Sequence, residues 1–159
     1  MGRIMKTSEP GAVSVTALRQ VADARGPVLH FLRCDSPDFV SFGEFYFSEV
    51  LPGMTKGWKR HRVQTQNIVV PVGRIQLVTF DDRVLSPERD GLNVFELGRP
   101  DAYCRVRIPP GIWYGFSCIS AVPALLANCA DVPHDPLESE SRPLNDGPVR
   151  FDWGQVSRD

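Results

Sequence analysis

Residues 53–73 read GMTKGWKRHRVQTQNIVVPVG, and the spacing within this stretch predicts the fold. Lys59 and His61 are two residues apart on an expected strand, so their side chains face the same side of the sheet. Gln66 returns on the neighbouring strand and faces them across the sheet pair, while Gly53 and Gly73 bound the stretch. We therefore expect two adjacent strands that carry a cluster of polar side chains.

The rest of the chain is typical of an all-β protein. Its 14 prolines and 13 glycines fall mostly between short runs rich in Val, Ile, Leu, Phe and Tyr. Within 74–81, period-two alternation places Ile75, Leu77 and Thr79 on one face. The expected strands cover residues 13–18, 27–32, 43–50, 54–61, 66–72, 74–81, 93–97, 102–108, 113–119, 124–130 and 149–153.

Length and composition favour a single domain over residues 1–159. The segment 134–147 is polar, acidic and proline-bearing, so we expect a surface loop there, followed by a C-terminal strand and tail over 148–159. Ten or so short strands with tight turns predict a sandwich or a small barrel.

The second polar cluster is Pro109-Pro110-Gly111-Ile112-Trp113-Tyr114. Together with 53–73 it resembles the two cupin motifs, one with a glycine, an H-x-H pair, a glutamate and a glycine, the other reading P-x-G-x-x-H. The resemblance implies a cupin, a double-stranded β-helix jelly roll. A metal cupin has His, His, Glu and His where this chain has Lys59, His61, Gln66 and Tyr114. Since a divalent metal needs three or four such donors, we predict no metal and no cofactor.

Nearly the whole chain resembles the dTDP-4-dehydrorhamnose 3,5-epimerases, which are metal-free cupins. The matching elements are Asp23-Ala24-Arg25-Gly26, Val72-Gly73-Arg74-Ile75 with Asp81-Asp82-Arg83, Ser86-Pro87, Ile108-Pro109-Pro110-Gly111 with Gly115-Phe116, and Leu144-Asn145-Asp146. The resemblance implies a homodimer that binds a dTDP-4-keto-6-deoxyhexose and moves protons next to the ketone in surface-polysaccharide synthesis.

The family's catalytic roles can be carried over to particular residues. His61 would be the base, oriented by Asp146, and a neutral imidazole suits that task at ordinary pH. Arg25 would contact the nucleotide diphosphate, because a planar guanidinium suits phosphate oxygens. Tyr114 would donate a proton from its phenol or close the mouth of the barrel with its ring.

Three more residues are candidates for substrate binding. Lys59 either holds an anion or an enolate inside the pocket or extends to solvent. Gln66 would orient the substrate, since an amide does not titrate. Trp113 would belong to the core and offer a stacking surface for the sugar or the base.

The chain departs from the epimerase pattern at four positions. The family's lysine falls on Gln66, its second histidine on Tyr114 and its acid tyrosine on Ala127. Its base histidine stands over Lys59, two residues before His61, which keeps the strand parity.

Two other functions stay open, with a third disfavoured. The dTDP-4-keto-6-deoxyglucose 3,4-ketoisomerases carry R-G-x-H-x-H followed by Q, G and a D-D pair, which 56–82 resembles in spacing. A non-catalytic cupin that binds a sugar nucleotide would fit the lost groups. A metal dioxygenase-type cupin would purify with stoichiometric metal.

Charge and hydropathy exclude several other partners. The 18 basic and 19 acidic residues give a net charge of −1 with no basic run, so we expect no nucleic-acid partner. We find neither a secretory signal nor a membrane span, and we expect a cytoplasmic protein without a membrane partner. Cys34, Cys104, Cys118 and Cys129 show no C-x-x-C spacing and are expected to be free thiols.

Overall fold

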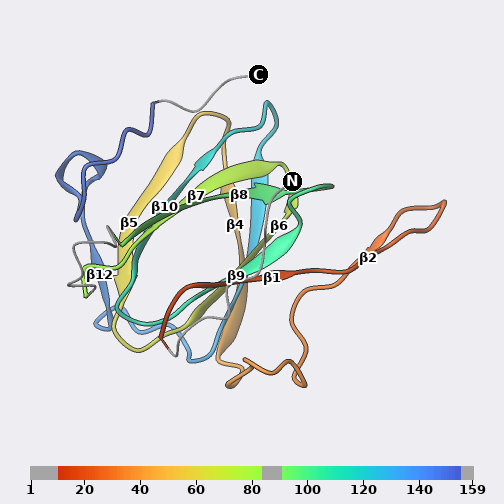
Figure 1. The fold of residues 1–159 in the computed structure, drawn as a ribbon, viewed down its shortest axis with the longest axis horizontal. Helices are drawn as coiled ribbons and strands as arrows, with labels where there is room; N and C mark the ends of the chain where they lie inside the picture. The colour runs from red at the N-terminus through yellow and green to blue at the C-terminus, as the bar shows by residue number, and fades with distance from the viewer. Residues whose placement is uncertain (1–10, 84–90, 155–159) are drawn as a thin grey trace.

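The computed structural model describes residues 11–83 and 91–154, which form two five-stranded antiparallel sheets and a small hairpin (Figure 1). The first sheet has the order β1 (Ser14–Ala17), β9 (Cys104–Ile108), β6 (Gln66–Val72), β11 (Ala124–Ala130) and β4 (Glu44–Val50). The second has the order β12 (Ser139–Ser141), β5 (Thr55–His61), β10 (Trp113–Cys118), β7 (Arg74–Phe80) and β8 (Leu92–Gly98). The expected all-β cupin jelly roll is confirmed, and Ser86-Pro87 lies outside the described residues.

The core lies between the two sheets, as period-two alternation predicts. Ile75 and Leu77 of β7 are fully buried there and meet Ile68 and Leu126 of the first sheet. Val78, which follows Leu77 on β7, points to the outer face of the sheet instead and belongs to a separate cluster there. Inner side chains of both sheets therefore form the main hydrophobic contact that holds the sandwich together.

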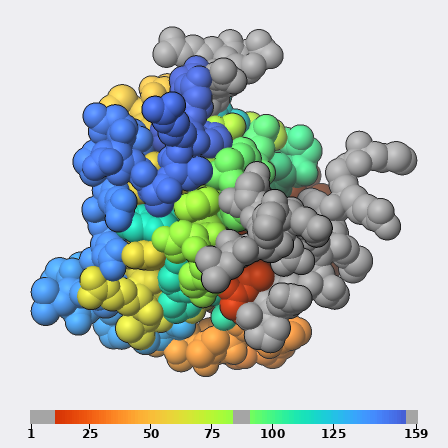
Figure 2. All heavy atoms as spheres, turned by 60° about the vertical axis from the view of Figure 1, so that its left-hand side comes forward, coloured from red at the N-terminus to blue at the C-terminus, as the bar shows by residue number. Residues whose placement is uncertain are grey.

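The outer face of the second sheet is covered by the C-terminal segment 144–153, which lies against this side of the molecule (Figure 2). Val149, Phe151 and Trp153 pack on Trp58 and Trp113, which are on adjacent strands. The expected strand over 149–153 is wrong, because these residues cross the face of the sheet, where no ladder hydrogen bonds are open to them. Residues 155–159 of the expected tail lie outside the described residues.

The segment 134–147 is only partly the surface loop that its composition predicts. Residues Ser139–Ser141 form β12, which pairs with β5 in the register Ser139↔His61, and a 3-10 turn follows at Leu144–Asp146. Glu138 is just 8% exposed. Polar composition misleads here because the acidic side chains of the segment bind groups of the barrel instead of water.

An arm formed by β2 (Gln20–Val21) and β3 (Val28–Leu29) projects from the sandwich (Figure 1). Leu29 of the arm and Phe31, which follows the arm, pack on the outer face of the first sheet against Val69 and Ala127. All four cysteines are free thiols, and three of them are buried. Within 11–83 and 91–154 the structure has no helix long and apolar enough to cross a membrane.

Candidate active site

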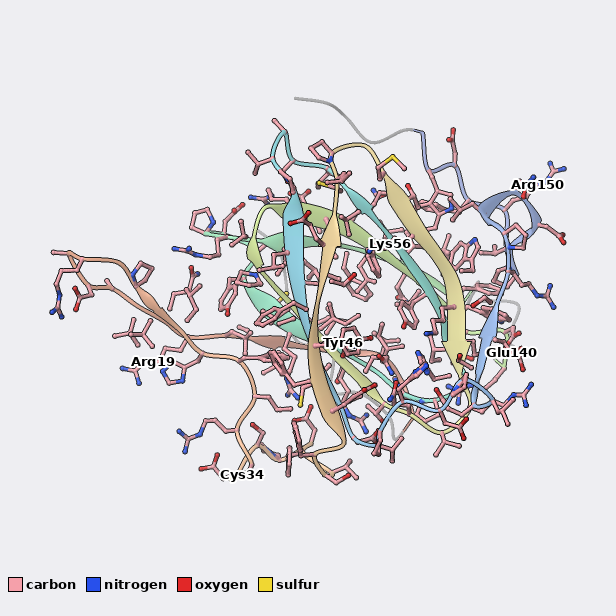
Figure 3. The ribbon with its side chains drawn as sticks, turned by 180° about the vertical axis from the view of Figure 1, so that it is seen from behind. Arg19, Cys34, Tyr46, Lys56, Glu140 and Arg150 are labelled. Atoms are coloured by element: carbon pink, nitrogen blue, oxygen red, sulfur yellow. The ribbon has the colours of Figure 1, made fainter. Side chains whose placement is uncertain are left out.

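A cavity of about 220 Å³ opens between the two sheets. Both polar and apolar side chains line it, as is usual for a small-molecule site. Its lining residues come from five strands; they are Tyr46, Ser48, Ile68, Leu126 and Asn128 of the first sheet and Lys56, Gly57, Lys59, Tyr114 and Phe116 of the second. Tyr46 on β4 and Lys56 on β5 are labelled in Figure 3.

A bulge in β5 brings both lysines of this strand to the cavity. Tyr114 pairs with Lys59 and Phe116 with Lys56, so β5 advances by three residues while β10 advances by two. Gly57 lies inside the bulge with φ +149, and a Cβ there would be 2.7 Å from the Cα of Gly115. Glycine is required at this position because both the backbone angle and the close approach exclude a side chain.

His61 and Tyr114 meet at the end of the cavity. The Tyr114 hydroxyl lies 3.1 Å from Nε2 of His61, and the two rings are stacked with their centroids 6.0 Å apart. Tyr114 lines the cavity, whereas His61 lies behind it and is 3% exposed. His61 is therefore connected to the cavity by its hydrogen bond with the Tyr114 hydroxyl.

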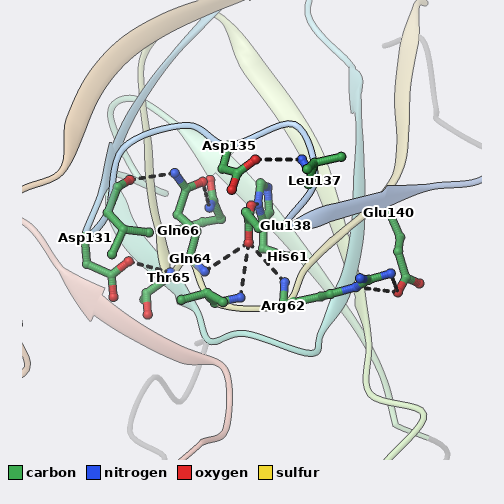
Figure 4. Close-up of polar contacts among 12 residues, drawn as sticks. His61, Arg62, Gln64, Thr65, Gln66, Asp131, Asp135, Leu137, Glu138 and Glu140 are labelled. Atoms are coloured by element: carbon green, nitrogen blue, oxygen red, sulfur yellow. Dashed lines mark hydrogen bonds and ion pairs between the residues drawn. The ribbon is translucent and has the colours of Figure 1, made fainter.

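Glu138 holds the other nitrogen of the His61 ring (Figure 4). Its Oε1 bonds Nδ1, and its Oε2 accepts the backbone N–H groups of Arg62, Val63 and Gln64 at 3.1, 3.1 and 3.2 Å. Three successive amides that converge on one oxygen form an anion-binding nest. The β5–β6 loop thus fixes the Glu138 carboxylate, and the carboxylate fixes the imidazole.

The expected pairing of His61 with Asp146 does not occur. Asp146 lies in the 3-10 turn after β12 with an exposed side chain, and Glu138 takes the position on Nδ1 that Asp146 was expected to hold. Because Ser139 of β12 pairs with His61 of β5, the preceding residue Glu138 lies beside His61. Asp146 lies in the 3-10 turn that follows β12 and is not brought to His61 by this pairing.

The hydrogen bonds define the protonation of this triad. Burial lowers the pKa of His61 below its ordinary value, against the opposite pull of Glu138. Burial would raise the pKa of Glu138, but its bonds from His61, Val63 and Gln64 hold that pKa below its ordinary value. Burial raises the pKa of Tyr114 far above its ordinary value. The network therefore fits a phenol that donates to Nε2 of a neutral imidazole, whose Nδ1–H donates to a carboxylate.

The two cavity lysines have different surroundings. The Nζ of Lys56 donates to the Ser48 hydroxyl at 3.0 Å and to the Glu49 carbonyl at 2.7 Å, so it bridges the two walls. The Lys59 ammonium makes no hydrogen bond or ion pair with the described part of the chain. Its ammonium is therefore available to an anionic ligand or to an oxygen that gains negative charge.

A chain of amide side chains lies behind the opposite wall. Gln66 donates to Gln64 at 2.6 Å and accepts a hydrogen bond from Asn128. Asn128 also donates to the Tyr46 hydroxyl at 2.7 Å. Gln66 is fully buried and does not line the cavity, so it acts on the cavity through Asn128 rather than by contact.

Comparisons with known proteins identify relatives of the whole chain, although no protein-family model matches it. A crystal structure of a dTDP sugar isomerase from Desulfovibrio desulfuricans G20 is 50% identical, covers 91% of this chain and 92% of that one, and has a TM-score of 0.84. The probable low-salt glycan biosynthesis epimerase Agl13 of Haloferax volcanii is 33% identical over 145 residues, which are 89% of this chain and 92% of the relative. The chain belongs to the dTDP-sugar epimerase and isomerase family.

A more distant solved structure shares the same fold. NovW, a 4-keto-6-deoxy sugar epimerase from the novobiocin gene cluster of Streptomyces spheroides, is 23% identical and covers 96% of this chain and 79% of its own, with a TM-score of 0.79. The 50% and 33% identical relatives confirm the family resemblance inferred from the sequence, and the solved structures confirm the jelly-roll fold.

Trp113 is not at the cavity of this family member. It is 1% exposed on the outer face of the second sheet, where Arg60 lies 4.4 Å above its ring and Asp82 accepts its indole N–H at 3.2 Å. The expected stacking role is wrong, because Trp113 is adjacent to Tyr114 on β10 and strand alternation turns it away from the cavity.

Arg25 is also distant from the cavity of its own chain. It lies in the turn of the β2–β3 arm, where its guanidinium forms a bidentate pair with Asp23 at 2.9 Å. Its side chain is 90% exposed. Arg25 is therefore not among the residues that line the cavity.

Reasoning from the sequence missed four residues of the site, which are Glu138, Tyr46, Lys56 and Asn128. The acidic alternation Glu138-Ser139-Glu140 was a usable signal for a strand that carries carboxylates. Lys56 is three residues from Lys59, so regular alternation would place their side chains on opposite faces of β5, and only the bulge at Gly57 brings both to the cavity. No three His, Cys, Asp or Glu side chains gather as metal ligands would among the residues that the structure describes.

Proposed function

We propose that this protein is a dTDP-sugar epimerase or isomerase that acts on a 4-keto-6-deoxyhexose by proton transfer next to the ketone, without a metal. The observation that carries the proposal is the linear unit Glu138–His61–Tyr114, whose hydroxyl end lies in the cavity. Support also comes from the 50% identical relative named a dTDP sugar isomerase.

The unit can remove a proton from carbon by relay. The Tyr114 oxygen takes the α-proton of the substrate while its own proton passes to Nε2 of His61. The imidazolium that forms is stabilised by the Glu138 carboxylate already bonded to Nδ1. Glu138 needs no rearrangement in this step, because three backbone amides hold it in place throughout.

The electrons left by the proton move to the ketone oxygen, which becomes an enolate. Lys59, whose ammonium has no partner among the described side chains, supplies positive charge for that oxygen. Lys56, nearer solvent, supplies charge for the diphosphate of the nucleotide. Gln66 orients the substrate indirectly, by holding Asn128.

The direct test is incubation with dTDP-4-keto-6-deoxyglucose in D₂O, followed by NMR of the sugar ring. Epimerisation gives deuterium at carbon 3 or carbon 5 with inverted configuration. A 3,4-ketoisomerase, the reaction kept open by the 56–82 spacing, instead gives a 3-keto product with deuterium at carbon 4. Absence of deuterium at all three carbons contradicts both reactions and leaves the non-catalytic sugar-nucleotide cupin.

We further propose a homodimer in which the arm of one copy brings Arg25 to the cavity of the other, where it binds the diphosphate. The projecting position of the arm supports this arrangement (Figure 1). Sedimentation of the protein tests the dimer, and an Arg25→Ala variant should raise KM for the sugar nucleotide. A chain that sediments as a monomer at assay concentration contradicts this role of Arg25. The relative named for glycan biosynthesis supports a place in polysaccharide assembly.

A further inference from the structure

Inversion at a carbon requires two proton-handling groups on opposite faces of the sugar, one that removes the proton and one that delivers another. The Glu138–His61–Tyr114 unit belongs to the second sheet and occupies one wall of the cavity. The tyrosine that family members place after the second motif falls on Ala127 here. This chain therefore needs its delivering group from another residue.

The structure explains why position 127 cannot supply that group. Ala127 packs on the outer face of the first sheet with Val69 and Tyr103, so a side chain at this position points away from the cavity. Its neighbour Asn128 points inward and lines the cavity. The Asn128 side chain makes three hydrogen bonds: its Nδ2 group donates to the Gln66 side chain and to the Tyr46 hydroxyl, and its Oδ1 accepts the backbone N–H of Asn67 at 3.1 Å.

Tyr46 lines the wall opposite Tyr114. It lies on β4, the edge strand of the first sheet, and is 38% exposed at the cavity (Figure 3). The Nδ2 group of Asn128 donates to its oxygen at 2.7 Å, which leaves the Tyr46 proton free to point elsewhere. The chain has three tyrosines, and the third, Tyr103, donates its hydroxyl to the His30 carbonyl outside the cavity.

We infer that Tyr46 is the catalytic acid that delivers a proton to the face of the sugar opposite Tyr114, with Asn128 as its positioning residue. The inference rests on the proposed epimerase function. In this step the Tyr46 O–H bond breaks, a C–H bond forms at the enolate carbon, and the ketone is restored.

After the step, exchange of protons with water returns both tyrosines and His61 to their starting states. Tyr46 is left as a phenolate, which the N–H of Asn128 stabilises until water at the exposed side of Tyr46 protonates it. The His61 imidazolium meanwhile returns its proton to the Tyr114 oxygen, and Tyr114 releases the proton taken from the sugar to water in the cavity. Burial raises the pKa of Tyr46 and the bond from Asn128 opposes that rise, so the group stays protonated at rest and remains able to act as an acid.

Proton exchange and inversion, measured separately in D₂O, test the inference. In a Tyr46→Phe variant we expect deuterium to enter the substrate with retained configuration, while formation of the inverted sugar falls by about 10²-fold or more. Tyr103→Phe, which removes a hydroxyl outside the cavity, is the matched control and should invert at the parent rate. Asn128→Asp should reproduce the Tyr46→Phe result, because a carboxylate there accepts a hydrogen bond from the Tyr46 hydroxyl and holds its proton away from the sugar. Thermal melting of each variant verifies that it is folded.

The outcomes separate this inference from the proposed function. A parent protein that exchanges no proton overturns the proposed function and the inference together. A parent that exchanges and inverts, with a Tyr46→Phe variant that inverts equally well, overturns only the inference. Equal loss of exchange and inversion in folded Tyr46→Phe also overturns it, because Tyr46 would then act before the delivery step.

Discussion

Glu138 bonds Nδ1 of His61 across a separation of 77 residues, and the same carboxylate closes the β5–β6 loop by accepting three backbone amides. One side chain therefore orients the imidazole, stabilises its protonated form and fixes the loop that follows it. The loop is held at its far end as well, where Asp131 accepts the Thr65 amide at 2.7 Å. A carboxylate with this many donors has little freedom to rotate, so the imidazole is oriented before any substrate binds.

Replacement of Glu138 by Gln should abolish most turnover. The amide leaves Nδ1 of His61 without an ionised partner, so we expect kcat to fall by about 10²- to 10⁴-fold with a smaller change in KM. The lost bonds from the loop amides should cost about 1–3 kcal/mol of unfolding free energy. Steady-state kinetics and chemical denaturation measure the two effects.

Two further carboxylate variants control that experiment. Glu140 is on the same segment but pairs with Arg60 and Arg62 at the surface, so Glu140→Gln should turn over within about twofold of the parent. Asp146→Asn compares the carboxylate expected from the sequence with the one found in the structure. An active Glu138→Gln enzyme beside an inactive Asp146→Asn enzyme would contradict the assignment of Glu138.

Acid should destabilise the protein in two steps. The pKa of His61 is lowered in the folded state, so the unfolded chain binds a proton first as the pH falls below 6.5, and stability drops from there to the folded pKa. The pKa of Glu138 is also lowered, so its contribution is present above 4.5 and is lost as the pH falls through its folded value. Denaturation midpoints measured from pH 8 to below the folded pKa of Glu138 should show both steps, and His61→Gln should lack the first. A stability curve that rises on acidification to pH 5 would refute this ionisation scheme.

Lys59→Met should lower kcat/KM without loss of stability. The ammonium has no partner in the described part of the chain, so its removal costs the fold less than about 0.5 kcal/mol, whereas the enolate loses a positive charge worth about 10²-fold in rate. Arg19→Met, which removes an exposed cation near the arm, is the control and should be fully active. Equal kcat/KM for Lys59→Met and the parent would remove Lys59 from the reaction.

Gly57→Ala should destabilise the protein through the bulge. A Cβ there must overcome both the φ of +149 and the approach of 2.7 Å to the Gly115 Cα, and we expect a loss of about 2–4 kcal/mol. Gly26→Ala is the matched control, since Gly26 has φ +130 but nothing within 4 Å of its Cβ position. The difference between the two variants in unfolding free energy isolates the close approach. Equal destabilisation of both would mean that the contact with β10 contributes nothing.

The strands were predictable because their determinants are local. Residues 66–72 and 124–130 agree with β6 and β11 at both ends, and Ile75 and Leu77 share the buried face that their alternation predicts. Lys59 and His61 were placed on one face for the same reason. Period-two patterning and turn residues carry this information within a few positions of each other.

The partners inside the site were not predictable because they depend on contacts between distant segments. Nothing near His61 in the sequence indicates that Glu138, which directly precedes the short strand β12 inside a polar segment, bonds to its ring. The residues 149–153 alternate like a strand, yet they cover a sheet face and bury the indoles of Trp58 and Trp113 that lie on it. The bulge at Gly57 likewise changes which face of the sheet Lys56 occupies. The extra residue of the bulge cannot be recognised from the alternation of apolar and polar residues alone.

The three tryptophans of the chain, Trp58, Trp113 and Trp153, all lie in the cluster on the outer face of the second sheet. Tyr114 and Lys59 are their immediate neighbours in sequence, but they point the other way, into the cavity. Intrinsic indole fluorescence of this protein is therefore a reporter of whether the C-terminal segment is docked. A ligand that fills the cavity should leave the emission nearly unchanged, while release of residues 144–153 should shift it to the red.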